Sequence, residues 1–143
     1  MYGSAIEELL GGTEIIGHEI RSEMDLYEIA RNGLPKKALV HLIQNLGFTV
    51  KFMASMINIT ERTLQRKSDI ELLDKVTSEQ VLQIADIYSR GNQVFGSSDS
   101  FSTWVNIESK ALNNKKPIEL LSSRYGAQMV FDELGRIEYG IPA

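Results

Sequence analysis

Residues 50–67 read VKFMASMINITERTLQRK. This pattern is typical of two short helices joined by a tight turn, which is the arrangement of a helix-turn-helix. Ala54 is the small residue at which the second helix can cross the first at close range. Asn58 stands at the turn, because asparagine is second to glycine in tolerating a left-handed backbone. The apolar positions expected to face the core are Met53, Ile57, Ile59 and Leu64.

The second helix of this segment should expose polar side chains that suit DNA. Arginine can pair with guanine and glutamine with adenine in the major groove, so we expect Arg62, Gln65 and Arg66 to contact base edges. Lysine and threonine side chains close to them could hold phosphates. The full set expected at the DNA is Thr49, Lys51, Thr60, Glu61, Arg62, Gln65, Arg66 and Lys67. The alternative is a pair of ordinary packed helices with an exposed basic surface.

The distribution of charge supports a polyanion site in the same region. The net charge is −4, but residues 34–67 hold six basic residues against one acidic residue, a local charge of +5. Residues 1–33 hold seven acidic and two basic residues, a local charge of −5. Clustered positive charge favours binding to a polyanion, because binding releases condensed counterions. The plain alternative is a solvated face that happens to be basic.

The composition is that of a globular protein of the cytoplasm. Apolar residues make up 43% of the chain, which is enough for a packed interior. The chain has no cysteine, which excludes disulfides and thiolate metal sites and suits a reducing compartment. The N-terminus lacks the features of a signal peptide, and no apolar run approaches the roughly 20 residues of a membrane helix. We therefore expect a cytoplasmic protein with no membrane partner.

Capping residues and helix breakers predict a chain of short helices. Residues 22–25 resemble a capping box, and Thr49, Thr60 and Ser123 are expected to cap later helices. We expect helices over about 23–31, 35–46, 50–57 and 61–67, a longer one from the capping box that begins at Thr77, and later ones around Trp104, after Pro117 and after Ser123. The first 20 residues predict only a turn at Gly11-Gly12 and then a strand or a loose arm. The expected fold is all-α, with an arm over residues 1–22, a helix-turn-helix module over 23–95 and a second domain over 96–143.

The second half of the chain should have its own apolar core. A lone tryptophan buries a large area, so Trp104 is expected to anchor this core. Further core candidates are Leu120, Leu121, Val130, Leu134 and Ile137. Gly126 lies in a predicted helix, where glycine costs about 1 kcal/mol relative to alanine. Either a close helix crossing or a helix start near Ser123 would explain it.

Several stretches of the second half together resemble the Xre/MbcA/ParS antitoxin family. They are Phe95-Gly96, Trp104, residues 111–121, Tyr125-Gly126, Val130 and residues 134–140. Residues 33–35 and 60–66 resemble the helix-turn-helix half of the same family, so the resemblance covers about residues 24–140. It implies an Xre-like helix-turn-helix N-terminal module and a small helical C-terminal toxin-binding domain. Two features depart from the family: Asn113-Asn114 replaces the usual paired glycines, and the N-terminal arm has no clear counterpart.

The resemblance also implies the partners and their chemistry. The toxins of this family are RES-domain proteins that attack NAD⁺, and the C-terminal part of the antitoxin occludes their active site. The complex typically represses its own operon. On this basis the residues expected to bind the toxin are Arg124, Arg136, Glu138, Tyr139, Gly140, Ile141 and Ala143. The plain alternative for the last residues is a frayed tail.

Catalysis is not expected. His18 and His41 have no acidic partner at a metal-ligand spacing, and adjacent Asp132 and Glu133 would point about 100° apart on a helix. No glycine-rich loop follows a strand, so a phosphate cradle is unsupported. We therefore expect no catalytic or metal-binding residues and no cofactor. The remaining alternative is a stand-alone helix-turn-helix transcriptional regulator whose second half dimerises or senses a ligand. A homodimer is expected in either case, because two-fold symmetric operators usually require one.

Overall fold

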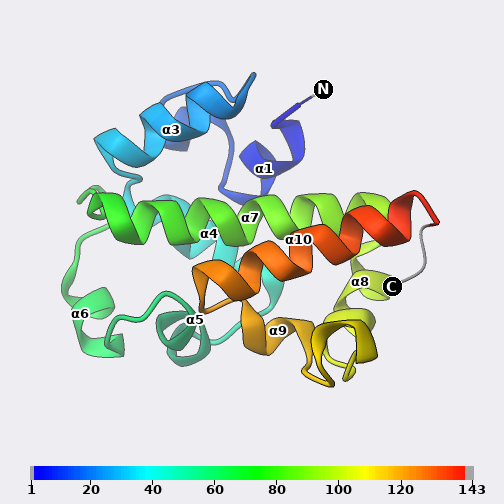
Figure 1. Ribbon diagram of the computed structural model, residues 1–143. Helices are drawn as coiled ribbons and strands as arrows, with labels where there is room; N and C mark the ends of the chain where they lie inside the picture. Colours follow the sequence, from blue (N-terminus) through cyan, green and yellow to red (C-terminus); the bar gives the residue numbers. More distant parts are fainter. Residues whose placement is uncertain (1, 141–143) are drawn as a thin grey trace. The chain divides into compact units, whose positions relative to one another are not determined.

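The computed structural model of the protein describes residues 2–140. Its elements, in chain order, are α1 (Ser4–Leu9), α2 (Thr13–Ile16), α3 (Glu23–Asn32), α4 (Lys36–Leu46), α5 (Val50–Met56), α6 (Glu61–Arg66), α7 (Lys75–Phe95), α8 (Ser98–Val105), the short 3-10 helix η1 (Lys110–Leu112), α9 (Pro117–Leu120) and α10 (Arg124–Glu138). Apart from two isolated bridges, the described residues contain no β-structure. The predicted all-α class is therefore confirmed. The chain divides into two compact units, Met1–Ala85 and Asp86–Ala143, and α7 runs through the division (Figure 1).

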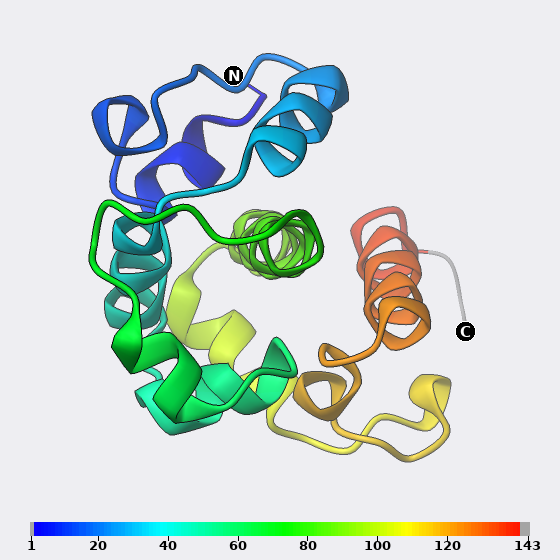
Figure 2. The ribbon, with the colours of Figure 1, turned by 90° about the vertical axis from the view of Figure 1, so that its left-hand side faces the viewer.

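The first unit packs α1 to α6 around the first half of α7. Figure 2 looks along α7 and shows α3, α4 and α6 on different sides of this half. In α4, apolar residues recur at the spacing that places them on one helix face. Fully buried side chains from four helices fill the centre of the unit: Leu39, Leu42, Met53, Leu64 and Ile84.

Helix α7 begins two residues before the predicted capping box, which was therefore the wrong start. The side chain of Asp74 accepts the N–H of Thr77 at 2.7 Å and caps the first turn. Ser78 is fully buried, and its hydroxyl accepts the backbone N–H of Leu34 at 2.9 Å. The local sequence around Ser78 suits a serine in a capping box and also a serine that binds a distant segment. The capping-box pattern therefore could not distinguish the two roles.

The predicted turn at Gly11-Gly12 is confirmed, but it joins two helices, and α2 stands where the sequence predicted a strand or a loose arm. The two helices pack against α4 and bury Ile6, Leu10 and Ile16. Asn45 of α4 strengthens this contact, because its Nδ2 donates to the carbonyl oxygen of Leu9 at 2.9 Å. The prediction failed because α2 has only four residues, which is too short for an apolar repeat to show.

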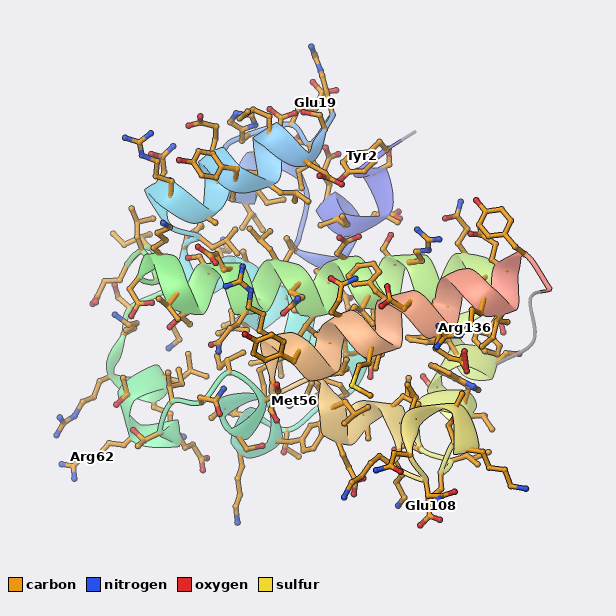
Figure 3. The ribbon with its side chains drawn as sticks, in the orientation of Figure 1. Tyr2, Glu19, Met56, Arg62, Glu108 and Arg136 are labelled. Atoms are coloured by element: carbon orange, nitrogen blue, oxygen red, sulfur yellow. The ribbon has the colours of Figure 1, made fainter. Side chains whose placement is uncertain are left out.

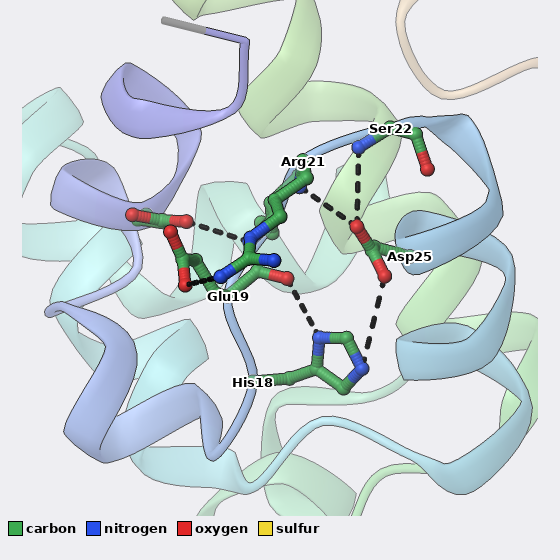
Figure 4. Close-up of polar contacts among 7 residues, drawn as sticks. His18, Glu19, Arg21, Ser22 and Asp25 are labelled. Carbon is green, nitrogen blue, oxygen red and sulfur yellow. Dashed lines mark hydrogen bonds and ion pairs between the residues drawn. The ribbon is translucent and has the colours of Figure 1, made fainter.

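A polar cluster holds the chain where it enters α3 (Figure 4). One carboxylate oxygen of Asp25 accepts the N–H of Arg21 at 2.8 Å and the N–H of Ser22 at 3.1 Å, which completes the predicted capping box. The guanidinium of Arg21 pairs with Glu19 at 2.8 Å, and this contact raises the pKa of Arg21. Ring atom Nδ1 of His18 lies 2.7 Å from the carbonyl oxygen of Glu19. These contacts fix a helix start, and they account for His18 without a metal.

The second unit is organised around Phe101 of α8, which is fully buried. Its ring meets Tyr88 edge-on with 5.1 Å between the ring centroids, and it stacks on Trp104 at 5.8 Å. A Cβ atom at Gly91 would lie 2.3 Å from the Phe101 ring, which explains a glycine in the middle of α7. Trp104 is only half-buried, so it belongs to this core through its stacking on Phe101 but is not the fully buried anchor that the sequence predicted.

The C-terminal helix is fixed by a close approach to α9. Ser123 caps α10 as predicted, because its hydroxyl accepts the N–H of Gly126. A Cβ atom at Gly126 would lie 2.2 Å from the carbonyl oxygen of Leu120. The close approach of α9 and the helix start at Ser123 therefore both explain this glycine. Asn113 and Asn114 both have a left-handed backbone, the conformation that paired glycines would supply. Ile137 is exposed, which corrects its predicted place in the core.

Replacing Asp74 should destabilise the protein in a pH-dependent way. The hydrogen bond from the Thr77 N–H lowers the pKa of the Asp74 carboxyl below its usual value. Removing such a cap costs about 1 kcal/mol, so Asp74→Ala should lower the free energy of unfolding by that amount at neutral pH. A carboxyl with a lowered pKa stabilises the fold above its unfolded pKa of about 4, and this stabilisation disappears as the pH falls through the folded value. Urea unfolding of both proteins at neutral and at acidic pH checks this. An equal difference at both pH values would contradict it.

Replacing Phe101 should destabilise the second unit more than replacing Trp104. Phe101→Ala removes a fully buried ring and leaves a cavity, which costs about 3–5 kcal/mol. Trp104→Ala should cost less, because part of that ring already contacts water. Urea denaturation followed by circular dichroism measures both. A larger loss for Trp104→Ala would show that Trp104 is the anchor after all.

Candidate nucleic-acid and protein interfaces

Helices α5 and α6 form the predicted helix-turn-helix. Thr49 caps α5 by accepting the N–H of Phe52 at 3.0 Å, and Thr60 caps α6 by accepting the N–H of Thr63 at 3.0 Å. Between the helices, Asn58 has a φ of 59°, so it takes the left-handed conformation that the sequence predicted. The N–H of Ile59 donates to the carbonyl oxygen of Ala54 at 3.0 Å and closes the turn.

The inner side of the two helices is apolar. Met53, Ala54, Ile57 and Leu64 are buried, as predicted, and Ile59 is half-buried. Ala54 carries only a methyl group where α6 packs against α5. The small residue, the left-handed turn and the apolar contacts therefore determine together which side of α6 faces outward.

The outer side carries the predicted DNA-binding residues. Seven of them are exposed and Lys67 is half-buried; the exposed ones are Thr49, Lys51, Thr60, Glu61, Arg62, Gln65 and Arg66. Positions 62, 65 and 66 lie on one face of a helix, because residues three and four apart are neighbours. Figure 3 shows Arg62 projecting away from the ribbon. Among the residues described, neither Arg62 nor Arg66 takes part in an ion pair.

Two lysines that sequence reasoning did not assign to the site lie next to α6. Lys36 donates from Nζ to the carbonyl oxygen of Lys67 at 2.7 Å. The backbone N–H of Lys37 donates to the carbonyl oxygen of Asp69 at 2.9 Å, and the Lys37 side chain is exposed. Both lie within residues 34–67, whose local charge of +5 was visible in the sequence. The contact between segments 36–37 and 67–69 could not be predicted from the sequence.

A second exposed surface lies on α10. Its inner side buries Ala127, Val130 and Leu134. The opposite side presents large apolar groups, of which Tyr125 is 84% and Tyr139 is 74% exposed. Met129 lies one helical turn after Tyr125 and is also exposed. Such a concentration of exposed aromatic and methionine side chains is typical of protein interfaces.

The charged residues near the end of α10 already have partners within the second unit. Arg136 donates from Nε to Glu133 at 2.8 Å, and the carboxylate of Glu133 is buried. Arg90 of α7 donates from Nη2 to Glu138 at 2.9 Å. Sequence reasoning missed Arg90, because no local pattern connects residues 48 positions apart.

The other predicted residues of this surface are less constrained. Arg124 and Gly140 are exposed, and Gly140 has a φ of 66°. Ile141 and Ala143 lie outside the described residues. Arg136, Glu138 and Tyr139 thus lie in the last turn of α10 or directly after it, and Arg124 lies at the opposite end of the helix.

Within residues 2–140, no group of three or more metal-ligating side chains is arranged to hold an ion. Helices long and apolar enough to cross a membrane are not found in this part of the chain.

Two family models match the chain. The antitoxin Xre-like helix-turn-helix domain matches residues 25–86. The antitoxin Xre/MbcA/ParS C-terminal toxin-binding domain matches residues 90–140. No curated protein matches the chain. The first match contains α5 and α6, and the second contains all of α10, so each of the two surfaces lies within a domain of known type.

Proposed function

Since the chain belongs to the Xre/MbcA/ParS antitoxin family, we propose that it neutralises a RES-domain toxin that consumes NAD⁺. We further propose that it occludes the toxin's active site and, as a homodimer, represses its own operon. The observation that carries the proposal is the presence of both domains in one chain, a helix-turn-helix at 25–86 and a toxin-binding domain at 90–140. Its action is binding rather than catalysis. The toxin-binding match favours this function over a stand-alone regulator.

DNA binding by α6 is supported by the exposure of its polar face. In this proposal Arg62, Gln65 and Arg66 contact base edges, while Lys51, Lys67 and Thr49 hold phosphates. Neither Arg62 nor Arg66 has to break an ion pair with another described residue in order to reach DNA. The amide of Gln65 lies 3.4 Å from Glu61, a long contact that is easily exchanged for an adenine edge.

Toxin binding by the end of α10 is supported by its mixed chemistry. A cleft that binds NAD⁺ must accept apolar rings and anionic phosphates. Tyr139 supplies exposed aromatic area and Arg136 positive charge at this end of the helix, and Arg124 adds positive charge at the helix start. Glu138 is paired with Arg90, and Arg136 is paired with Glu133. Each can bind the toxin only if it shares its present partner with the toxin or exchanges that partner for a toxin residue. The proposal extends to Gly140, Ile141 and Ala143, which follow directly in the chain.

The first test removes the two arginines of α6. Each should contribute about 1–3 kcal/mol at a specific operator, so Arg62→Ala with Arg66→Ala should weaken binding tenfold or more. Gel-shift titration on the upstream promoter measures this, and repeating it at several salt concentrations should show a steep dependence. The matched control is Arg31→Ala with Lys110→Ala, which removes two exposed positive charges outside both proposed interfaces. Unchanged affinity in the Arg62/Arg66 variant would contradict DNA readout by α6.

The second test removes residues 139–143. The shortened protein should fold, because Tyr139 and Gly140 are exposed and the ion pair between Arg90 and Glu138 is retained. It should still bind operator DNA but no longer protect cells that express the toxin. Co-expression with the toxin and circular dichroism of the purified protein check both expectations.

The control for the truncation is Tyr27→Ala, which removes an exposed tyrosine from α3. This variant should protect cells as well as the unaltered protein does. Full protection by the folded, shortened protein would contradict occlusion by the tail. Inhibition would then belong to the upstream surface that includes Tyr125 and Arg124.

A further inference from the structure

Helix α6 carries one acidic side chain on its otherwise polar and basic surface. Glu61 is the single acidic residue among residues 34–67, where it stands against six basic residues. It is exposed, and it is the first residue of α6, directly before Arg62. A carboxylate at this place repels the phosphates that the basic residues attract, so it lowers the affinity for DNA of any sequence. Its presence on the helix that faces DNA therefore needs a separate reason.

The local fold does not require the carboxylate of Glu61. Thr60 caps α6 by itself, because its hydroxyl accepts the N–H of Thr63 at 3.0 Å and donates to the Thr63 hydroxyl at 2.6 Å. A capping box would place its acidic residue at the third helical position, which Thr63 occupies here. Among the described residues, Glu61 takes part in no ion pair. What remains is a weak attraction to the dipole of a short helix.

A hydrogen bond links Glu61 to the next turn of α6. The Nε2 atom of Gln65 donates to Oε1 of Glu61 at 3.4 Å. Residues four apart share a helix face, and both side chains are exposed. In helix-turn-helix proteins, the first residues of the second helix are the ones that contact base edges. Glu61 therefore lies where a base is read, on the same face as Gln65.

The chemistry of a carboxylate restricts the base that it can bind. An ionised carboxylate offers hydrogen-bond acceptors and no donor. In the major groove, guanine presents two acceptors, and thymine presents an acceptor and a methyl group. Adenine presents an amino group beside an acceptor, whereas cytosine presents an amino group alone. Cytosine is thus the base that a carboxylate binds with the least repulsion.

We propose that Glu61 is a specificity-determining residue that selects cytosine at one position of the operator. Its carboxylate accepts a hydrogen bond from the N4 amino group of cytosine. It rejects the other bases, because it places a negative charge against their acceptors. Repulsion of wrong partners is a general way to gain specificity at the expense of affinity. The inference rests on the proposed binding of operator DNA by α6, and it adds the base that one residue of this surface recognises.

Removing the charge should change specificity more than affinity. Glu61→Gln keeps the size of the side chain and removes its charge. Binding to duplexes of unrelated sequence should tighten, most clearly at low salt, because a repulsion of phosphates is lost. The ratio of specific to non-specific affinity should fall about fivefold or more, which is the contribution of one specific base contact. A merely structural role would weaken both kinds of binding and leave this ratio unchanged.

Selection from a randomised library identifies the base directly. The full chain and its variants each bind duplexes with a randomised centre, and the bound DNA is sequenced. The unaltered protein should enrich cytosine at one position. Glu61→Gln should enrich adenine there, because glutamine pairs with adenine, and Glu61→Ala should show no preference there. The remaining positions should keep their preferences.

The matched control is Glu23→Gln. Glu23 is likewise an exposed first residue of a helix, and it follows the capping residue Ser22 as Glu61 follows Thr60. This control should select the same sequence as the unaltered protein and keep the same ratio of affinities. Circular dichroism and thermal melting establish that each variant is folded.

The results separate this inference from the proposed function. If the unaltered protein and both Glu61 variants select the same sequence, the inference is overturned while operator binding stands. If the unaltered protein enriches another base at the position that responds to Glu61, the assignment of cytosine is overturned. A protein that selects no sequence at all contradicts operator binding, and this inference falls with it. Protection against the toxin should be equal in the unaltered protein and Glu61→Gln, because the toxin-binding match lies at residues 90–140.

Discussion

The hydroxyl of Ser78 satisfies the buried backbone of Leu34, and much of the first unit depends on this contact. Leu34 is fully buried, so without Ser78 its N–H would lose a hydrogen bond with no water to replace it, at a cost of about 1–3 kcal/mol. The same hydroxyl donates to the carbonyl oxygen of Leu73 at 3.3 Å. Residues 34 and 73 are thereby held at the start of α7. The segment that follows α6 lies alongside the start of α4 for this reason, which places Lys36 and Lys37 next to the basic face of α6.

Helix α7 is the element that both units share. Its first half buries Val81, Ile84 and Ala85 in the first unit, and its second half buries Tyr88 and Gly91 in the second. A helix of 21 residues gives each unit a rigid surface on which shorter helices can pack. Most of those helices have fewer than twelve residues, and helices of that length are marginal alone in water. Their stability must therefore come from burial against α7 and against one another.

Features that depend on neighbours along the chain were predicted correctly from the sequence. Features that depend on distant segments of the fold were not. The caps Ser22, Thr49, Thr60 and Ser123 were predicted correctly, because a cap binds a backbone N–H three residues away. The face of α6 was predictable for the same reason, since Asn58 and Ala54 fix its turn locally. The failed predictions, Ser78 as part of a cap and Trp104 as the core anchor, concern residues whose neighbours come from elsewhere in the fold. Nothing in the local sequence distinguishes a half-buried Trp104 from a buried Phe101.

The two candidate interfaces differ in how their charges are balanced, and this difference has a consequence for binding. Arg62 and Arg66 make no ion pair among the described residues. No ion pair has to be broken there before the two side chains can bind phosphates or base edges. Glu138 is paired with Arg90 before any toxin arrives. A toxin that uses Glu138 must offer a better donor than Arg90, and breaking an existing pair offsets much of the gain. Affinity at the end of α10 should therefore come mainly from Tyr139 and its apolar neighbours, while the charged pairs there hold the helix end in position and select the orientation of the partner.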